Sequence, residues 1–296
     1  MATSGSRWQI VAALAAVYLI WGSTYLIIRI GVQELPPALF ASSRFLLGGV
    51  LMLAYALARG ARLPYTRPQW ALIALTAVLM LVGGNGLVTW SEQWLESNQA
   101  ALLVATSALW MTGLGALGPQ GEKPGALALA GLALGFVGVG ILVSSGLSLR
   151  AAPWFAYFAI SLSPLFWAAG SVLSRRRPLA LNSVMVAAMQ SLIAGLILLA
   201  IGFGAGETGR WHWSATGVGA ILYLAVLGSC LGYGAYIWLV HQITPTQLGT
   251  YAYVNPAVAV LLGWWILDEH LNSSQIAGTL VILLGVLLAT LSPRQK

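Results

Sequence analysis

Long apolar stretches alternate with short polar segments along almost the whole chain. A bilayer core of about 30 Å is crossed by a helix of about 20 predominantly apolar residues. The pattern therefore predicts an all-α membrane protein with ten transmembrane helices and no room for a soluble domain. The expected helices lie at residues 8–30, 38–58, 70–94, 98–118, 125–145, 154–174, 182–204, 216–240, 246–267 and 274–292.

The sequence also contains an internal repeat of half its length. One set of matching residues is separated by 147 positions: Glu122, Gly131 and Gly138 recur as Glu269, Gly278 and Gly285. A second set is separated by 146 positions, and it pairs Trp21 with Trp167, Arg29 with Arg175, Arg44 with Gln190, and Gly49 with Gly195. We expect a first repeat at residues 1–148 and a second at 149–296. Because five helices are an odd number, the second repeat is expected to be inverted, as in secondary transporters whose site lies near the midplane.

The composition and the charge distribution agree with this architecture. Hydrophobic residues make up 59% of the chain and charged residues only 7%, against about 25% charged in a soluble domain. With the N-terminus inside, ten Lys and Arg residues fall in inner loops and tails and two in outer loops. Positive charge is retained on the cytoplasmic side of membranes. The net charge of +7 therefore indicates cytoplasmic termini in a multi-pass protein of a bacterial inner membrane, and no nucleic-acid partner.

Motifs for enzyme chemistry do not occur in the sequence. A single cysteine, Cys230, excludes a disulfide framework and a cysteine-based metal site. No HExxH, P-loop or GxSxG pattern is present. We therefore expect no enzyme activity, no cofactor and no metal.

Three aromatic residues on the first helix, Tyr18, Trp21 and Tyr25, are spaced to share one face. Most tryptophans fall near helix ends, where an interfacial belt explains them, but Trp21, Trp110 and Trp167 do not. Because Trp21 and Trp167 are repeat mates near mid-depth, we expect them to face each other as walls of an aromatic cavity. The alternative is two bulky residues that pack between helices or face lipid.

Arg44 lies about two turns inside the second helix, where a charge is costly unless it is paired or hydrated. On the third helix, Asn85, Thr89, Glu92 and Glu96 are spaced to lie on one face. We expect Arg44 to border a polar cavity, either paired with Glu92 or free to receive a substrate carboxylate. A structural salt bridge or an arginine that snorkels to the surface is the alternative.

Later helices add three tyrosines that resemble the lining of a pocket, namely Tyr233, Tyr236 and Tyr253, although hydrogen bonds between helices would also explain them. The Gly-x-x-x-Gly pairs 131/135 and 228/232 predict close helix contacts. A monomer or a weak homodimer is expected.

Several short motifs together resemble the drug/metabolite transporter superfamily, and more narrowly its ten-helix EamA-type exporters. They are W-G-S-T-Y at 21–25, P-P-A-L-F-A-S-S-R-F at 36–45, G-N-G-L at 84–87, and L-D-E-H-L at 267–271 followed by Gly278 and Gly285. The resemblance implies a 5+5 inverted-repeat fold, with the fifth and tenth helices to the side of a central cavity. It also implies export of small metabolites such as amino acids. The proline often found midway along the fourth helix is absent, since Leu109 stands opposite Pro256, so a symmetric kink of the fourth and ninth helices is not expected.

The residues and the resemblance together predict a secondary transporter that exports small metabolites, most simply amino acids, by alternating access. An exporter of aromatic or cationic drugs is the alternative, because a carboxylate that faces aromatic rings would suit a cation. Glu92 is the candidate for proton coupling. A passive channel and a membrane-embedded enzyme or lipid-handling protein are more distant alternatives.

Overall fold

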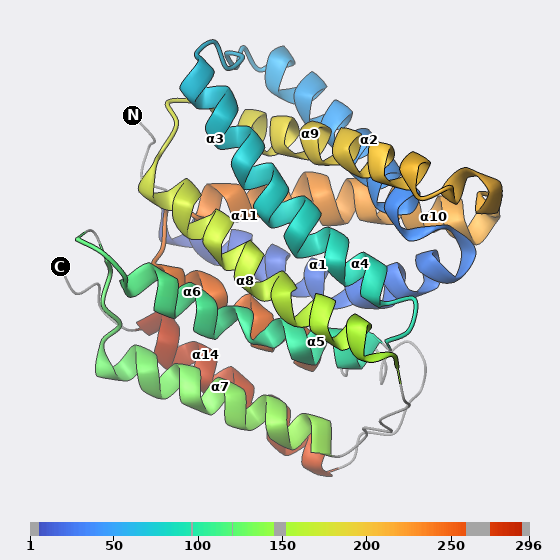
Figure 1. The fold of residues 1–296 in the computed structure, drawn as a ribbon. Helices are drawn as coiled ribbons and strands as arrows, with labels where there is room; N and C mark the ends of the chain where they lie inside the picture. Colours follow the sequence, from blue (N-terminus) through green and yellow to red (C-terminus); the bar gives the residue numbers. More distant parts are fainter. Residues whose placement is uncertain (1–5, 96, 120, 145–151, 259–272, 292–296) are drawn as a thin grey trace.

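The computed structural model describes residues 6–95, 97–119, 121–144, 152–258 and 273–291, and the regular structure in these ranges is helical (Figure 1). The helices of the first half are α1 (Arg7–Glu34), α2 (Pro37–Ala58), α3 (Arg67–Ala77), η1 (Val78–Gly86), α4 (Leu87–Ser91), α5 (Ser97–Ala105), α6 (Ser107–Ala116) and α7 (Ala126–Ser144). Those of the second half are α8 (Trp154–Arg176), α9 (Ser183–Gly204), η2 (Glu207–Arg210), α10 (Ala215–Tyr223), η3 (Leu224–Tyr233), α11 (Gly234–Leu239), α12 (Pro245–Gly249), the helical residues 251–258, and α14 (Ser273–Leu291).

Side-chain caps fix where several of these helices begin. Ser6 and Gln9 form a capping box at the start of α1, and Thr66 and Gln69 form one at the start of α3. Such a box satisfies two backbone N–H groups that have no partner within the helix. The first helical position after Thr66 is followed by a proline, which lacks the N–H that a helix start cannot use.

Seven helical segments in the described residues are long and apolar enough to cross a membrane: Arg7–Glu34, Pro37–Ala58, Arg67–Ser91, Gln99–Ala116, Trp154–Arg176, Ser183–Gly204 and Ala215–Leu239. Two further apolar helices, Ala126–Gly138 and Ile276–Ala289, are shorter by this measure. The expected helix at 246–267 is described only as far as residue 258, and Glu96 and Glu269 also lie outside the described residues.

Two π-helical segments occupy equivalent places in the two halves. The segment η1 begins at Val78 and η3 begins at Leu224, the same offset of 146 residues that separates the sequence repeats. Each lies in the middle of a long helix: η1 lies between α3 and α4, and η3 lies between α10 and α11. A π-helix is rare and occurs most often at functional sites. The sequence pattern predicts uninterrupted helices here, so these segments are a correction.

The fourth and ninth expected helices are both interrupted at a threonine. The α-helical hydrogen-bond pattern is interrupted at Thr106, between α5 and α6, and again at Thr250, before residue 251, and in both places the backbone N–H donates to the carbonyl three residues earlier. Each hydroxyl donates to the carbonyl three residues earlier, at 2.8 Å to Leu103 O and 2.6 Å to Gln247 O. Such local hydrogen bonds compete with the helical ladder. The two interruptions lie 144 residues apart, three fewer than the 147 that separate Leu109 from Pro256, so they are similar in kind but do not occupy matching positions of the repeat.

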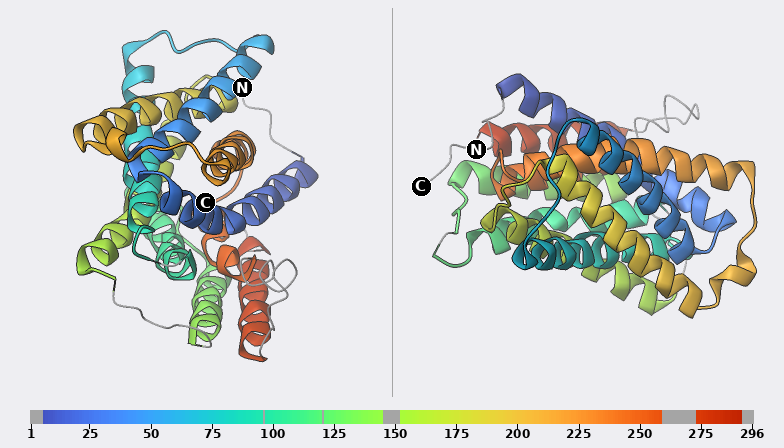
Figure 2. Two further views of the ribbon diagram at one scale, coloured as in Figure 1. Left: turned by 90° about the vertical axis from the view of Figure 1, so that its right-hand side faces the viewer. Right: turned by 90° about the horizontal axis from the view of Figure 1, so that it is seen from above.

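Close helix contacts repeat the pseudo-symmetry. The helices α7 and α14 pack side by side at one side of the bundle (Figures 1 and 2). A Cβ added to Gly138 would lie 2.9 Å from the Gly278 carbonyl oxygen, and one added to Gly285 would lie 2.7 Å from that of Gly131. The pairing is reciprocal, because 131 matches 278 and 138 matches 285 in the repeat. The glycine spacing at 131–135 thus serves a contact within the chain.

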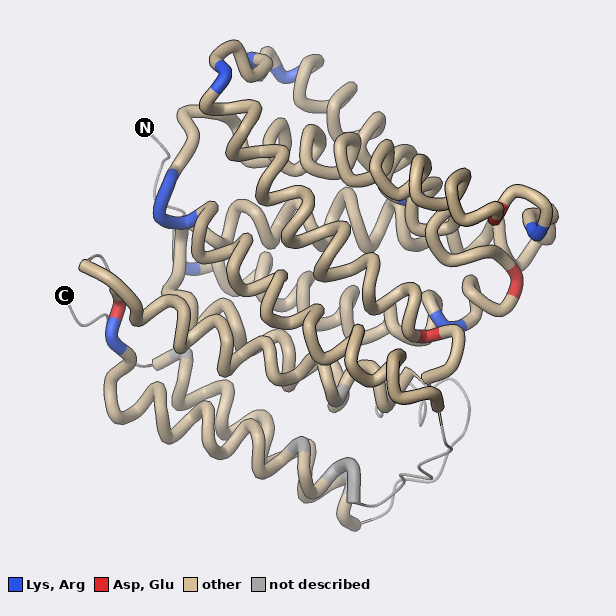
Figure 3. Tube along the Cα trace, in the orientation of Figure 1, with Lys and Arg blue, Asp and Glu red and all other residues tan. Residues whose placement is uncertain are grey.

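Charged residues gather at the two ends of the helix bundle (Figure 3). Arg7 begins α1, Arg59 follows α2, and Arg175 and Arg176 end α8 at what we call the basic end. Glu34 ends α1 at the opposite end. Many large apolar side chains, such as Leu19, Val50 and Leu196, lie exposed on the outside of the bundle. Their exposure suits contact with lipid tails rather than water.

Candidate substrate pathway

An aromatic cluster lies at the centre of the bundle. The rings of Trp21 and Trp167 meet edge to face, with centroids 5.3 Å apart, so the predicted contact between these repeat mates is present. Tyr236 packs against both, at 5.0 Å and 5.2 Å, and Tyr251 packs against Trp21 at 5.2 Å. Edge-to-face pairs at these distances are favourable beyond the area that they bury.

Indole and hydroxyl groups in this cluster are tied to the backbone and to each other. The Trp21 Nε1–H donates to the Gly228 carbonyl within η3, at 3.2 Å. The Trp167 Nε1–H donates to the Tyr236 hydroxyl at 2.9 Å, which also lies 2.8 Å from the Ser171 hydroxyl. The π-helical segment η3 therefore contributes a carbonyl that anchors the first helix at the pathway.

A small central cavity of about 60 Å³ lies beside this cluster. Residues from both halves of the chain line it, from α1, α2, η1, α4, α5 and α6 in the first half and from α8, η3 and the helical residues 251–258 in the second. The lining consists of Trp21, Thr24, Tyr25, Ile28, Arg44, Phe45, Leu81, Gly84, Asn85, Val88, Val104, Ser107, Ser163, Trp167, Gly228, Tyr233 and Tyr251. The wall is thus mainly apolar and aromatic with a few polar groups, which is the usual character of a small-molecule site.

Arg44 supplies a cation to this cavity. Its side chain is only 4% exposed, and its guanidinium carbon lies 4.5 Å from the centre of the Phe45 ring. Neither Nε nor Nη1 has a hydrogen-bond partner among the described residues. Burial of a charged group without a hydrogen-bonded partner destabilises a protein by roughly several kcal/mol. Two of its nitrogens can therefore still donate to a hydrogen-bond partner, while Glu92 interacts with the guanidinium only through its charge.

Glu92 is fully buried, and its charge interacts with those of Arg44 and Arg29. Its backbone carbonyl accepts a hydrogen bond from Arg29, but neither carboxylate oxygen has a hydrogen-bond partner among the described residues. Of the two arrangements that the sequence left open for Arg44, the structure has the one without a hydrogen-bonded pair to Glu92. Two unsatisfied groups of opposite charge thus lie in the same region of the bundle.

The predicted site residues divide into two sets of six. The cavity brings together Trp21, Tyr25, Arg44, Asn85, Trp167 and Tyr233. The other six lie outside its lining, and they are Tyr18, Thr89, Glu92, Trp110, Tyr236 and Tyr253.

Each residue of the second set has another environment. The Tyr18 and Thr250 hydroxyls lie 2.5 Å apart, and Thr89 is buried and bonded to the Asn85 carbonyl. Trp110 is 41% exposed on the outside of α6. Tyr253 packs against α7, where Gly135 leaves room for its ring. Sequence reasoning missed Tyr251, which lines the cavity two residues before Tyr253.

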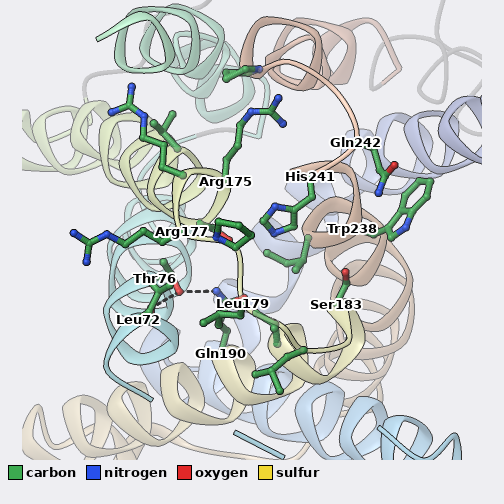
Figure 4. A pocket seen from close by; sticks show the side chains of 18 of the residues that line it. Leu72, Thr76, Arg175, Arg177, Leu179, Ser183, Gln190, Trp238, His241 and Gln242 are labelled. Atoms are coloured by element: carbon green, nitrogen blue, oxygen red, sulfur yellow. Dashed lines mark hydrogen bonds between the residues drawn. The ribbon is translucent and has the colours of Figure 1, made fainter. Parts of the chain in front are cut away.

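A larger vestibule of about 460 Å³ lies at the basic end (Figure 4). It is lined by residues from α3, α8, α9 and the segment that follows α11, among them Thr76, Arg177, Ser183, Gln190 and His241. This volume falls within the range of about 300–1,000 Å³ typical of ligand pockets, whereas the central cavity is far smaller.

Two arginines stabilise the walls of the vestibule. Arg175 Nε lies 2.6 Å from a carboxylate oxygen of Glu122, and its Nη1 donates to the Val240 and Ile243 carbonyls at 2.6 and 2.5 Å. Arg176 donates to carbonyls at the end of α6, including Leu114 O at 2.9 Å. Helix ends leave carbonyls without partners, and these guanidinium groups satisfy them.

The imidazole of His241 borders the same vestibule. Burial lowers the pKa of His241 below its ordinary value of 6.5, and the nearby Arg175 lowers it further. The neutral form is therefore favoured at neutral pH.

The architecture and the sequence together define the family of this protein. A bundle of apolar helices with a central cavity and a vestibule at one end has the form of a multi-pass membrane carrier. A model of the EamA-like transporter family matches the chain twice, over residues 7–144 and 154–291. The chain belongs to the EamA-like transporter family, and thus to the drug/metabolite transporters that its motifs resemble. It is a multi-pass transporter of the inner membrane rather than an enzyme.

Individual relatives extend over most of the chain. The inner membrane transporter YedA of Escherichia coli (strain K12) is 41% identical over 280 residues, which cover 94% of this chain and 90% of YedA. A probable amino-acid metabolite efflux pump of Salmonella typhimurium is 24% identical over 288 residues, with 91% of each chain covered. One crystal structure superposes with a TM-score of 0.78 at 22% identity, over 97% of this chain and 98% of the other. At that identity the likeness concerns the fold.

Proposed function

We propose that the protein exports amino acids, including those with aromatic side chains, across the bacterial inner membrane by alternating access. Two inverted five-helix repeats, residues 1–148 and 149–296, would rock about the central cavity, with both chain termini in the cytoplasm. The observation that carries this proposal is the buried guanidinium of Arg44 in an aromatic-lined cavity, where Nε and Nη1 have no hydrogen-bond partner among the described residues. A substrate carboxylate would supply the missing acceptor, and charge-assisted bonds of this kind are the strong ones.

Three further observations support the proposal. The aromatic cluster around Trp21 and Trp167 suits an apolar or aromatic side chain. The cavity offers one cation in its lining, which suits one carboxylate better than a phosphate ester. The Salmonella relative carries a name that refers to efflux of amino-acid metabolites.

Counterflow in proteoliposomes tests this proposal. Proteoliposomes that contain the purified protein would be loaded with one unlabelled amino acid at a time. Uptake of the labelled form of that amino acid would then be followed with and without a pH gradient. We expect saturable counterflow for at least one amino acid, and its loss in Arg44→Ala. Counterflow that is unchanged in Arg44→Ala for every amino acid transported would overturn the carboxylate role. Stimulation by the pH gradient that disappears in Glu92→Gln would identify Glu92 as the coupling group.

Export of aromatic or cationic drugs is a second candidate, and it is favoured by the buried carboxylate of Glu92, which has no hydrogen-bond partner among the described residues. A cation would be attracted both by this carboxylate and by the faces of the aromatic rings. The two candidates separate in one variant. Glu92→Gln would abolish resistance to cationic drugs if drugs are the substrate, and would leave Arg44-dependent amino-acid counterflow in place if they are not.

A further inference from the structure

The vestibule and the central cavity share a wall. Gln190 lines the vestibule and Tyr233 lines the central cavity. The two side chains are joined directly, because the Tyr233 hydroxyl donates to Gln190 Oε1 at 2.8 Å. The same hydrogen bond therefore has one compartment on each side.

The hydrogen bonds in this wall form an ordered chain. Gln190 Nε2 donates to the Thr76 hydroxyl at 2.7 Å (Figure 4). The Thr76 hydroxyl donates in turn to the Leu72 carbonyl, at 2.8 Å. Donors and acceptors therefore alternate from η3 through α9 to α3, and all three side chains are at most 2% exposed. A buried network of hydrogen bonds of this kind fixes the elements that it joins.

The two compartments differ in what they can hold. The vestibule of about 460 Å³ accommodates a small solute, and the central cavity of about 60 Å³ does not while the wall between them is closed. A solute that moves from the vestibule to the aromatic cluster must separate Gln190 from Tyr233. We infer that the Thr76–Gln190–Tyr233 network is the gate at the basic end of the pathway, and that Gln190 is the positioning residue that holds Tyr233 closed. The inference rests on the proposed transport pathway, but the gate can be tested without a substrate.

The repeat places no such network at the other end. The positions that match Gln190, Tyr233 and Thr76 are Arg44, Leu87 and Leu222. Two leucines cannot donate or accept a hydrogen bond. The gate is therefore an asymmetric feature on a pseudo-symmetric frame, and it belongs to the vestibule side.

Thiol accessibility measures whether the wall is closed. The only cysteine, Cys230, would be replaced by serine, and one new cysteine would be introduced in the full-length protein. Ser183→Cys reports on the vestibule and Ser163→Cys on the central cavity, since these residues line the two compartments. An anionic, membrane-impermeant methanethiosulfonate would be added to inside-out vesicles, in which we propose that the vestibule faces the bath.

The gate predicts different rates for the two cysteines. Ser183→Cys should react quickly in every background, and it also identifies the side on which the vestibule opens. Ser163→Cys should react slowly in the parent. Gln190→Leu or Tyr233→Phe should accelerate its modification by about tenfold, because each removes a hydrogen bond that holds the wall closed. Tyr253→Phe is the matched control, since it also removes a buried tyrosine hydroxyl, but one that lines neither compartment and has no hydrogen-bond partner among the described residues.

Each alternative outcome contradicts the gate. Fast modification of Ser163→Cys in the parent would show that the wall is open. Slow modification in both gate variants, while Ser183→Cys still reacts, would place the barrier elsewhere. Tyr233→Phe removes a single oxygen atom, so it remains informative if Gln190→Leu folds poorly. These rates do not depend on which solute is carried, so failure of amino-acid counterflow and failure of the gate are separate results.

Discussion

Arg44 and Gln190 occupy matching places in the two repeats and have opposite environments. Arg44 lines the central cavity with two nitrogens that lack partners among the described residues, whereas Gln190 uses both ends of its amide. The helices that carry them pack reciprocally, because Gly49 faces Leu192 and Gly195 faces Leu46. The repeat therefore preserves the packing of α2 against α9 and lets the polar chemistry diverge.

This difference separates what holds the bundle together from what it transports. Satisfied groups such as Gln190 stabilise one arrangement of helices, and an unsatisfied buried ion such as Arg44 lowers the stability of the empty protein. A group of the second kind becomes favourable only when a ligand completes it. Substitution at the two positions should therefore produce opposite effects on stability and on transport.

The largest expected effect is the loss of transport on replacement of Arg44. Arg44→Leu should reduce counterflow of a carboxylate substrate by about a hundredfold, as expected for a lost charged hydrogen bond. The midpoint of thermal unfolding in detergent should stay the same or rise, because an unpaired buried charge is replaced by an apolar side chain. Arg44→Lys, which keeps the charge without the planar fork, is the control. A marked fall in the unfolding midpoint of Arg44→Leu would show that the guanidinium has a structural partner.

Gln190→Leu should have the opposite signature. It removes the acceptor of Tyr233 and one donor to Thr76, so that the free energy of unfolding should fall by about 2 kcal/mol. Thermal or denaturant unfolding beside Arg44→Leu makes the comparison within one method. Equal destabilisation by the two leucines would mean that the two positions are equivalent in energy as well as in sequence.

The sequence predicts the frame of the bundle and the central tryptophans because both depend on long-range regularities. Apolar stretches of span length and an offset of 146 residues need no knowledge of side-chain angles. The contact between Trp21 and Trp167 follows, since repeat mates near mid-depth lie close to the symmetry axis. The six predicted residues that line the cavity come from α1, α2, η1, α8 and η3.

The remaining residues depend on local backbone geometry that the apolar pattern does not encode. Residues two apart in a helix point in different directions, and the apolar pattern does not tell which of Tyr251 and Tyr253 faces the cavity; in the structure it is Tyr251. The break at Thr106 precedes Trp110, which lies on the outside of α6. Glu92 caps the end of α4, and it does not line the cavity with Asn85 as the shared face of an ideal helix predicts.

A smaller effect should be symmetric and thus contrast with Arg44 and Gln190. Gly138→Ala and Gly285→Ala each place a Cβ within 3 Å of backbone atoms across the α7–α14 contact. Each should lower the free energy of unfolding by about 1 kcal/mol, because crowding outweighs the helix propensity that alanine adds. Gly140→Ala, which would meet nothing within 4 Å, is the control and should unfold at or above the parent midpoint. Unequal effects of the two matched substitutions would restrict the symmetry to the backbone.

The smallest expected effect is a pH dependence of the stability that arises from His241 in the vestibule. Burial and Arg175 lower the pKa of His241 below 6.5, so the unfolded chain binds a proton more readily than the folded one. Stability is therefore retained above pH 6.5, begins to fall as the pH drops below that value, and has lost the full contribution of His241 below the lowered pKa. The midpoint temperature of thermal unfolding should decrease as the pH is lowered from about 7.5 to about 5.0, a range that brackets histidine titration. The variant His241→Gln should show a smaller decrease. The charged neighbours that face His241 in the vestibule are Arg175, Arg176, Arg177 and Glu122, so Glu122→Gln, which removes the one carboxylate among them, should make the fall steeper. An identical pH profile in His241→Gln and the parent would assign the titration to another group, and the vestibule would then keep its charge unchanged over this range.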